Sequence, residues 1–189
     1  MEGALARSDR GHCVRFGKEH RLSGPPTMTR YEDLATHATR WVDQFYRHKD
    51  LCRIMIQRVA AAFADYMGCP SGRVSFVGLD GDLRFTGRPA LLGDQPHLVR
   101  GEDGFWYTGL QVMLQTPNSN AVMKERIRLG INYTGTRYLI ALGIGRFEID
   151  ESSLMGLPAL VEAMLSQSLD HYTQPVHAGP MPPGFMANR

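Results

Sequence analysis

Residues 124–145, KERIRLGINYTGTRYLIALGIG, decide the fold of this chain. In the first half a basic residue stands at every second position up to Arg128 and the residues between are mostly apolar, as in a strand with one buried face. The second half is apolar, and the residues YTGT between the halves favour a turn. We therefore predict a hairpin of strands 121–133 and 136–149, preceded by a strand at 105–116.

The turn sets the register of this predicted sheet. A two-residue turn at Thr134 and Gly135 pairs the residues that flank it, and every pair upstream follows. The predicted cross-strand pairs are Tyr133–Thr136, Ile127–Leu142, Leu110–Ile127 and Trp106–Ile131. One face is then apolar and must be covered by helices. Glu125 is the exception on that face, and we expect it to reach solvent or to pair with an arginine.

The opposite face carries the cations, each beside small residues. Arg128 is expected beside Ala141 and Gly109, Arg126 beside Gly143, and Lys124 beside Gly145. One interpretation is a solvated face on which the aliphatic stems of the cations shield the glycines. The other is a shallow, glycine-floored groove for an acidic ligand. The candidate binding residues on this face are Tyr107, Gln111, Lys124, Arg126, Arg128, Gly143 and Gly145.

A helical pattern runs from Thr29, which forms a capping box with Glu32, to about Met67. Its apolar residues repeat at heptad spacing, and they include Trp41 and Phe45. About 38 helical residues would span roughly 57 Å, whereas a domain of this size is about 40 Å across. The helix therefore overhangs the domain, pairs with a second copy, or breaks within 46–51. His48, in the same repeat, is a ligand, a pH sensor or a hydrogen-bonded structural residue.

Two further patterns complete the fold. Segments 73–78 and 83–87 flank the turn signal Asp80-Gly81, and residues 153–172 have one apolar helical face that includes Leu169. We predict a two-layer α+β domain: an antiparallel sheet of about five strands with a long N-terminal helix, or helix pair, and a C-terminal helix on one face. The predicted organisation is a flexible leader at 1–27, a single domain at 28–173, and a Pro-rich flexible tail at 174–189. Phe185 in this tail is the alternative anchor for a partner.

Composition and motifs narrow the function classes. A hydrophobic content of 43% and a net charge of +2 are typical of a globular protein without a bulk preference for nucleic acid. We find no catalytic, metal-binding or cofactor-binding motif, so no catalytic residue, metal or cofactor is predicted. No membrane span or secretory signal is recognised, and the scattered cysteines suggest reduced thiols, so we expect a cytoplasmic protein. Cys52 fits the helical pattern as a small hydrophobe.

These observations favour a binding or assembly module rather than an enzyme. We expect it to engage a protein partner, with self-association as the leading form, through the helix, the tail or the glycine-rich face. Two alternatives stay open. The basic face binds nucleic acid or another acidic ligand, or the protein is a small enzyme or ligand carrier with a pocket between helices and sheet.

Overall fold

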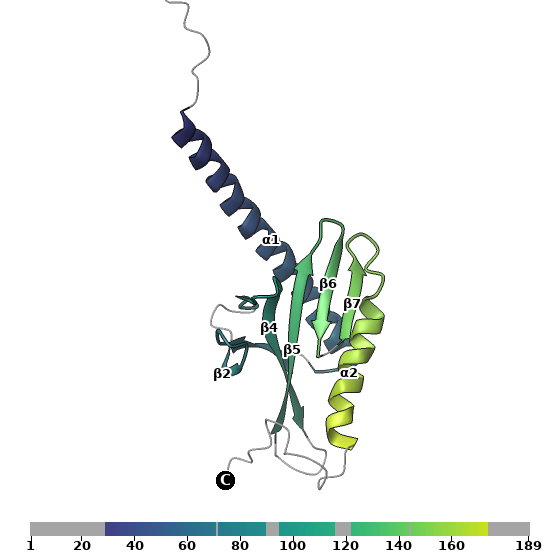
Figure 1. Ribbon diagram of the computed structural model, residues 1–189. Helices are drawn as coiled ribbons and strands as arrows, with labels where there is room; N and C mark the ends of the chain where they lie inside the picture. The colour runs from purple at the N-terminus through teal and green to yellow at the C-terminus, as the bar shows by residue number, and fades with distance from the viewer. Residues whose placement is uncertain (1–28, 71, 90–94, 116–121, 144, 174–189) are drawn as a thin grey trace, which may run out of the picture. The chain divides into compact units, whose positions relative to one another are not determined.

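The computed structural model describes residues 29–70, 72–89, 95–115, 122–143 and 145–173 (Figure 1). The predictions for the leader at 1–27, for the tail at 174–189 and for Phe185 fall outside these residues. The chain divides into two compact units, one up to Thr39 and one from Arg40. The first contributes residues 29–39, the cap and first turns of a helix, and everything else described below belongs to the second. The domain boundaries 28–173 stay a prediction.

The N-terminal helix α1 spans Arg30–Tyr66 without interruption. Its predicted capping box is confirmed: the Thr29 amide donates to Glu32 Oε2 at 2.7 Å, and the Glu32 amide donates to Thr29 Oγ1 at 3.2 Å. Because the helix is continuous, the alternative of a break within 46–51 is excluded. The polar run at this point does not end the helix, because His48 hydrogen-bonds to a strand and the Lys49 ammonium lies 5.1 Å from the ring of Trp106.

Within the described residues, seven antiparallel strands form one sheet, where about five were expected. They are β1 (Val74–Leu79), β2 (Phe85–Pro89), β3 (Val99–Arg100), β4 (Trp106–Gln115), β5 (Val122–Tyr133), β6 (Arg137–Leu142) and β7 (Gly145–Asp150). The order across the sheet is β2-β1-β4-β5-β6-β7, with β3 beside one end of β4 (Figure 1). With α1 and the C-terminal helix α2 (Leu157–Thr173), this arrangement confirms the α+β class.

The register of β4 against β5 is the predicted one. Leu110 lies opposite Ile127 and Trp106 opposite Ile131. Ile127 is buried and Arg128 is exposed, so the two faces of β5 point as expected. This alternation fixes which side of the sheet the helices cover.

The register of β5 against β6 was predicted wrongly by two residues. Tyr133 pairs with Tyr138 rather than with Thr136. The turn is longer because both the amide and the hydroxyl of Thr134 donate to the Arg137 carbonyl, at 2.9 and 3.1 Å. A shift of two residues leaves every side chain on its predicted face.

The predicted strand 136–149 is in fact two strands. β6 ends at Leu142, Gly143 adopts φ +57°, and β7 begins at Gly145 and runs back along β6. Such a positive φ suits glycine, which has no Cβ to clash with its own backbone. The reversal removes Gly143 and Gly145 from the positions predicted for them beside Arg126 and Lys124.

The core lies between the helices and the apolar face of the sheet, in one continuous cluster. Its fully buried side chains include Met55, Ile56, Val59, Phe63, Leu110, Leu129, Ile131, Ile140, Ile149, Leu160 and Met164. Cys52 is buried here too, as predicted, and burial raises its pKa to about 12. In α2 the predicted apolar face is correct except at Leu169, which is 51% exposed, while Ser168 is buried.

Glu125 neither reaches solvent nor pairs with an arginine, so that expectation was wrong. Its side chain is buried beneath α2, where the Tyr172 hydroxyl donates to Oε2 at 3.0 Å and His171 Nδ1 lies 3.2 Å from Oε1. Burial, together with the neighbouring carboxylate, raises the pKa of Tyr172 to about 12. The end of α2 is thus tied to β5 by polar contacts that the strand pattern alone does not reveal.

The hydrogen bonds of Asp150, in the loop after β7, should make the stability of the fold sensitive to acid. Asp150 Oδ1 accepts hydrogen bonds from the hydroxyls and amides of Ser152 and Ser153, and these bonds hold the Asp150 pKa well below its usual range. A depressed pKa stabilises the fold above the unfolded-state value of about 4, and this stabilisation is lost as pH falls. Asp150→Asn should therefore lower the melting temperature at neutral pH, and its deficit relative to the natural chain should shrink below about pH 4.

Thermal unfolding followed by circular dichroism between neutral and acid pH measures this deficit. Asp82→Asn is the control, because the Asp82 carboxylate accepts no hydrogen bond from the described residues. A deficit of Asp150→Asn that stays constant down to the acid limit would contradict the assignment.

Candidate binding surfaces

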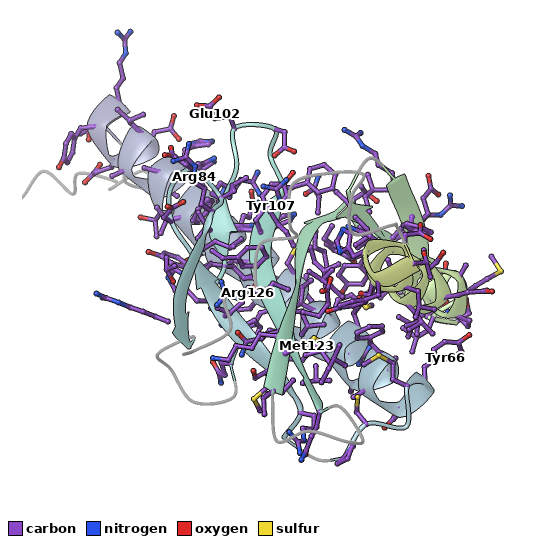
Figure 2. The ribbon with its side chains drawn as sticks, turned by 90° about the horizontal axis from the view of Figure 1, so that it is seen from below. Tyr66, Arg84, Glu102, Tyr107, Met123 and Arg126 are labelled. Carbon is purple, nitrogen blue, oxygen red and sulfur yellow. The ribbon has the colours of Figure 1, made fainter. Side chains whose placement is uncertain are left out.

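Five of the predicted site residues share one face of the sheet, and two do not. In the ladder between β4 and β5, Gln111 pairs with Arg126 and Gly109 with Arg128. Figure 2 shows Tyr107 and Arg126, from these neighbouring strands, on the side of the sheet away from the end of α1 at Tyr66. The residues brought together are Tyr107, Gln111, Lys124, Arg126 and Arg128. Gly143 and Gly145 lie instead at the turn between β6 and β7.

The glycines of this face are covered by the protein's own side chains. A Cβ on Gly130 would lie 2.6 Å from Tyr107 Cε1, and one on Gly109 would lie 2.6 Å from Val77 Cγ1 and 2.8 Å from Phe85 Cε1. These positions are glycine because neighbouring side chains pack directly onto the backbone. The glycines are therefore not an open floor, and the cations stand beside the covering side chains.

The guanidinium groups of Arg126 and Arg128 are held in place by neighbours. Arg126 donates from Nε to Gln111 Oε1 at 3.4 Å, and its guanidinium carbon lies 5.8 Å from the ring centre of Phe85. Arg128 donates from Nη1 to the Leu83 carbonyl at 3.3 Å. A guanidinium has five N–H donors, so each keeps most of them for another acceptor.

Arg146 on β7 joins this face, and sequence reasoning missed it. Its partner Ala141 pairs in turn with Gly130, and its guanidinium carbon lies 5.5 Å from the ring centre of Phe105. The residue was hidden because the reversal at Gly143 was not foreseen. The available signal was the pair Gly143 and Gly145, which are separated by a single residue. We call Lys124, Arg126, Arg128 and Arg146, with Tyr107 and Gln111, the basic face.

One carboxylate beside the basic face, that of Asp103, is already engaged. Tyr107 donates its hydroxyl to Asp103 Oδ2 at 2.6 Å. Burial and this bond raise the Tyr107 pKa to about 12, so the phenol is neutral at physiological pH. Burial opposes ionisation of Asp103, but the bond from Tyr107, backbone amides and the charge of Arg146 together lower its pKa. Within the described ranges the four cations have no carboxylate within 4.0 Å, in contrast to Arg53 and Arg137.

A second surface, which we call the aromatic patch, consists of Trp41, Val42, Phe45 and Tyr46 on α1. Trp41 is 64% exposed, Val42 42% and Tyr46 59%, while Phe45 is half-buried. Phe45 stacks on Trp41 with ring centres 5.5 Å apart and contacts the core residue Trp106 at 5.1 Å. The heptad pattern indicated Trp41 and Phe45, whereas Val42 and Tyr46 lie outside that repeat.

His48 is a hydrogen-bonded structural residue beside this patch. The Trp106 indole N–H donates to Nδ1 at 3.0 Å, so Nδ1 is the acceptor of this pair. Nε2 lies 3.0 Å from Asn132 Oδ1, 3.1 Å from the Tyr133 carbonyl oxygen and 3.3 Å from the Tyr133 amide nitrogen. His48 therefore joins α1 to β4 and β5 at once.

Two open grooves lie at the margins of the layers. One, of about 460 Å³, runs between the β6–β7 turn and α2 and is lined in part by Gly143, Gly145, Phe147 and Gln167. The other, of about 360 Å³, lies between α1 and the β5–β6 turn. The space between helices and sheet is filled by the core cluster.

The described part of the chain also bears on metal sites and membrane spans. No three His, Cys, Asp or Glu side chains of that part gather as metal ligands would. None of its helices combines the length and the apolar composition needed to cross a bilayer.

Comparisons of the chain with protein-family models, with curated proteins and with solved structures found no match.

Proposed function

We propose that this protein is a non-catalytic assembly module that associates with a second copy of itself through the aromatic patch. The supporting observation is the exposure of Trp41 and Tyr46 around Phe45, which is itself in contact with the core. Tryptophan and tyrosine dominate the energetic centres of protein interfaces. The partly buried ring of Phe45 gives the patch a fixed base, so little side-chain freedom is lost on binding.

The size of the patch suits the centre of an interface rather than a complete one. An aromatic side chain buries about 150–250 Å² when fully covered, whereas a stable interface buries about 800 Å² per partner. The surrounding residues of α1 must therefore contribute to the contact. Pairing across a two-fold axis brings the same helix surface from both copies together, which is the commonest geometry of soluble oligomers.

Sedimentation over a range of concentrations tests the proposal. We expect the mass to rise from 21.1 kDa towards twice that value as the concentration increases. Tyr46→Ser should weaken the association by about tenfold or more, because it removes a residue at the centre of the contact.

Tyr66→Ser provides a matched control on the same helix. Tyr66 is 56% exposed, close to the 59% of Tyr46, but lies at the far end of α1. This change should leave the association constant unaltered. A chain that stays monomeric at every concentration, or equal losses in the two variants, would refute the proposal.

A further inference from the structure

We infer that the basic face binds single-stranded nucleic acid, with its arginines on the phosphates and its aromatic rings beside the bases. This surface lies on the sheet, separate from the aromatic patch on α1, and the inference does not depend on self-association. Three features of the described residues support it: cations that no carboxylate of these residues pairs, arginines in fixed positions, and aromatic side chains among them.

The cations of the face are regularly spaced along a strand. Lys124, Arg126 and Arg128 alternate along β5, which places successive cations about 7 Å apart. Arg146 adds a fourth from β7, and in the described part of the chain none of the four meets a carboxylate within 4.0 Å. The nearby Asp103 is occupied by the Tyr107 hydroxyl. A linear row of cations complements a polymer with a negative charge on each unit.

The arginines are ordered before any ligand arrives. Arg126 is hydrogen-bonded to Gln111 and contacts the ring of Phe85. Arg128 is hydrogen-bonded to the Leu83 carbonyl. Arg146 contacts the ring of Phe105. Side chains already held in one arrangement lose less entropy when they bind. The planar guanidinium fork matches the two free oxygens of a phosphodiester as well as it matches a carboxylate. The preference for nucleic acid over an acidic peptide therefore comes from the aromatic rings beside the cations.

Aromatic side chains interleave with these cations. Tyr107 and Phe85 are both half-buried on this face, and each leaves part of its surface to solvent. Combining a positive surface with aromatic rings is how proteins bind single strands, because every base has a face that can stack. The bases of a duplex are stacked on one another and are read only from the grooves by a protruding helix or ribbon. The sheet face presents no such projection among the described residues, so a single strand is the form that fits.

Fluorescence anisotropy with a labelled oligothymidylate of about 16 nucleotides tests the inference. We expect binding at low salt that weakens steeply as salt is added. Arg128→Gln and Arg146→Gln should each lower affinity by about threefold to tenfold. Each should also reduce the slope of log affinity against log salt by about 0.7.

Three control variants test whether binding depends on the cations of the basic face. Arg137→Gln removes a cation that already pairs with Glu148 at 3.0 Å, and should leave affinity unchanged. Arg128→Lys keeps the charge, so the salt slope should stay as in the natural chain while affinity falls modestly. Tyr46→Ser should bind with the natural per-chain affinity, which separates failure of the assembly proposal from failure of this one.

Several outcomes would overturn the inference. They are no binding at low salt, equal losses in Arg137→Gln and Arg128→Gln, and competition by polyglutamate or phosphatidylserine vesicles as effective as that by unlabelled oligonucleotide. Lys124→Gln, at an exposed position near the strand end, supplies a further variant with little risk to folding. Its affinity should fall in the same range as that of Arg128→Gln.

Discussion

Replacing Gly156 by alanine should lower the free energy of unfolding by about 3–5 kcal/mol, as backbone strain and a steric clash add together. Gly156 has φ +97°, where a residue with a Cβ is strained. The added Cβ would lie 2.1 Å from the Glu148 carbonyl oxygen and 3.2 Å from its carbon. Both atoms belong to the backbone of β7, so no side-chain rotation relieves the clash. Urea denaturation followed by circular dichroism measures the loss.

Gly135→Ala separates the two contributions. Gly135 has a nearly identical φ of +102°, but its added Cβ would meet no atom within 4 Å. This variant should lose only the conformational part, about 1–2 kcal/mol. The difference between the variants then measures the steric part, and equal losses would mean that the approach of Gly156 to Glu148 does not constrain the fold.

The contact matters because it sets the start of α2. Leu160 donates its amide to the Gly156 carbonyl at 3.1 Å, so the glycine belongs to the first turn as well as to the β7 contact. The Asp150 amide donates to the Met155 carbonyl at 3.1 Å and closes the same loop. A displaced Gly156 would therefore move the helix that covers Leu142 and Ile149.

The alternation of buried and exposed side chains along β5 was predictable because it depends on the strand's own sequence. A residue's side of a strand depends only on its parity, and burying Arg128 in place of Ile127 would cost far more than any turn preference. The pairing of β4 with β5 followed, since it had to align the two apolar faces. The α+β class was within reach of the sequence for the same reason.

The turns were harder to predict, because a two-residue turn and a longer one are both compatible with the sequence between β5 and β6. Thr134 and Gly135 suit a two-residue turn, but the Thr134 hydroxyl and amide both reach the Arg137 carbonyl and stabilise the longer one. The break after Leu142 was masked by apolar residues on both sides of Gly143. Apolar runs do not reveal where a strand reverses.

The candidate surfaces depend on contacts between distant residues. Arg128 is held by Leu83 and Arg146 by Phe105. Such pairs follow from the order of strands in the sheet, which one sequence does not specify. On α1, the heptad repeat identified the apolar seam but not which part of it stays exposed.

His48→Phe should lower the free energy of unfolding by about 2–4 kcal/mol, because it leaves buried polar groups without partners. The indole N–H of Trp106, a residue only 3% exposed, loses its acceptor. The Asn132 side chain and the Tyr133 backbone lose their hydrogen-bonding partner Nε2. The phenyl ring is larger than imidazole, so the loss does not come from a cavity. Chemical denaturation is the measurement.

His37→Phe on the exposed surface of α1 controls for the change of residue type within a helix. His37 is exposed and its hydrogen bond among the described residues is to Asp33, one turn earlier, so its replacement should alter stability by less than about 0.5 kcal/mol. Similar losses in the two variants would show that the sheet contacts of His48 do not contribute.

A double-mutant cycle identifies the bond responsible. Trp106→Phe removes the indole donor, so it should be destabilising alone, yet should cost less when His48 is already phenylalanine. We expect a coupling energy of about 1 kcal/mol or more, because the neutral hydrogen bond between Nε1 and Nδ1 is present only in the natural chain. Additive losses would contradict a direct bond and would place the effect of His48 in its contacts with Asn132 and Tyr133.

Self-association provides a second measurement of the same contact. The ring centre of Phe45, in the aromatic patch, lies 5.1 Å from that of Trp106. If Trp106 loses its fixed orientation in His48→Phe, self-association through Phe45 should weaken along with stability.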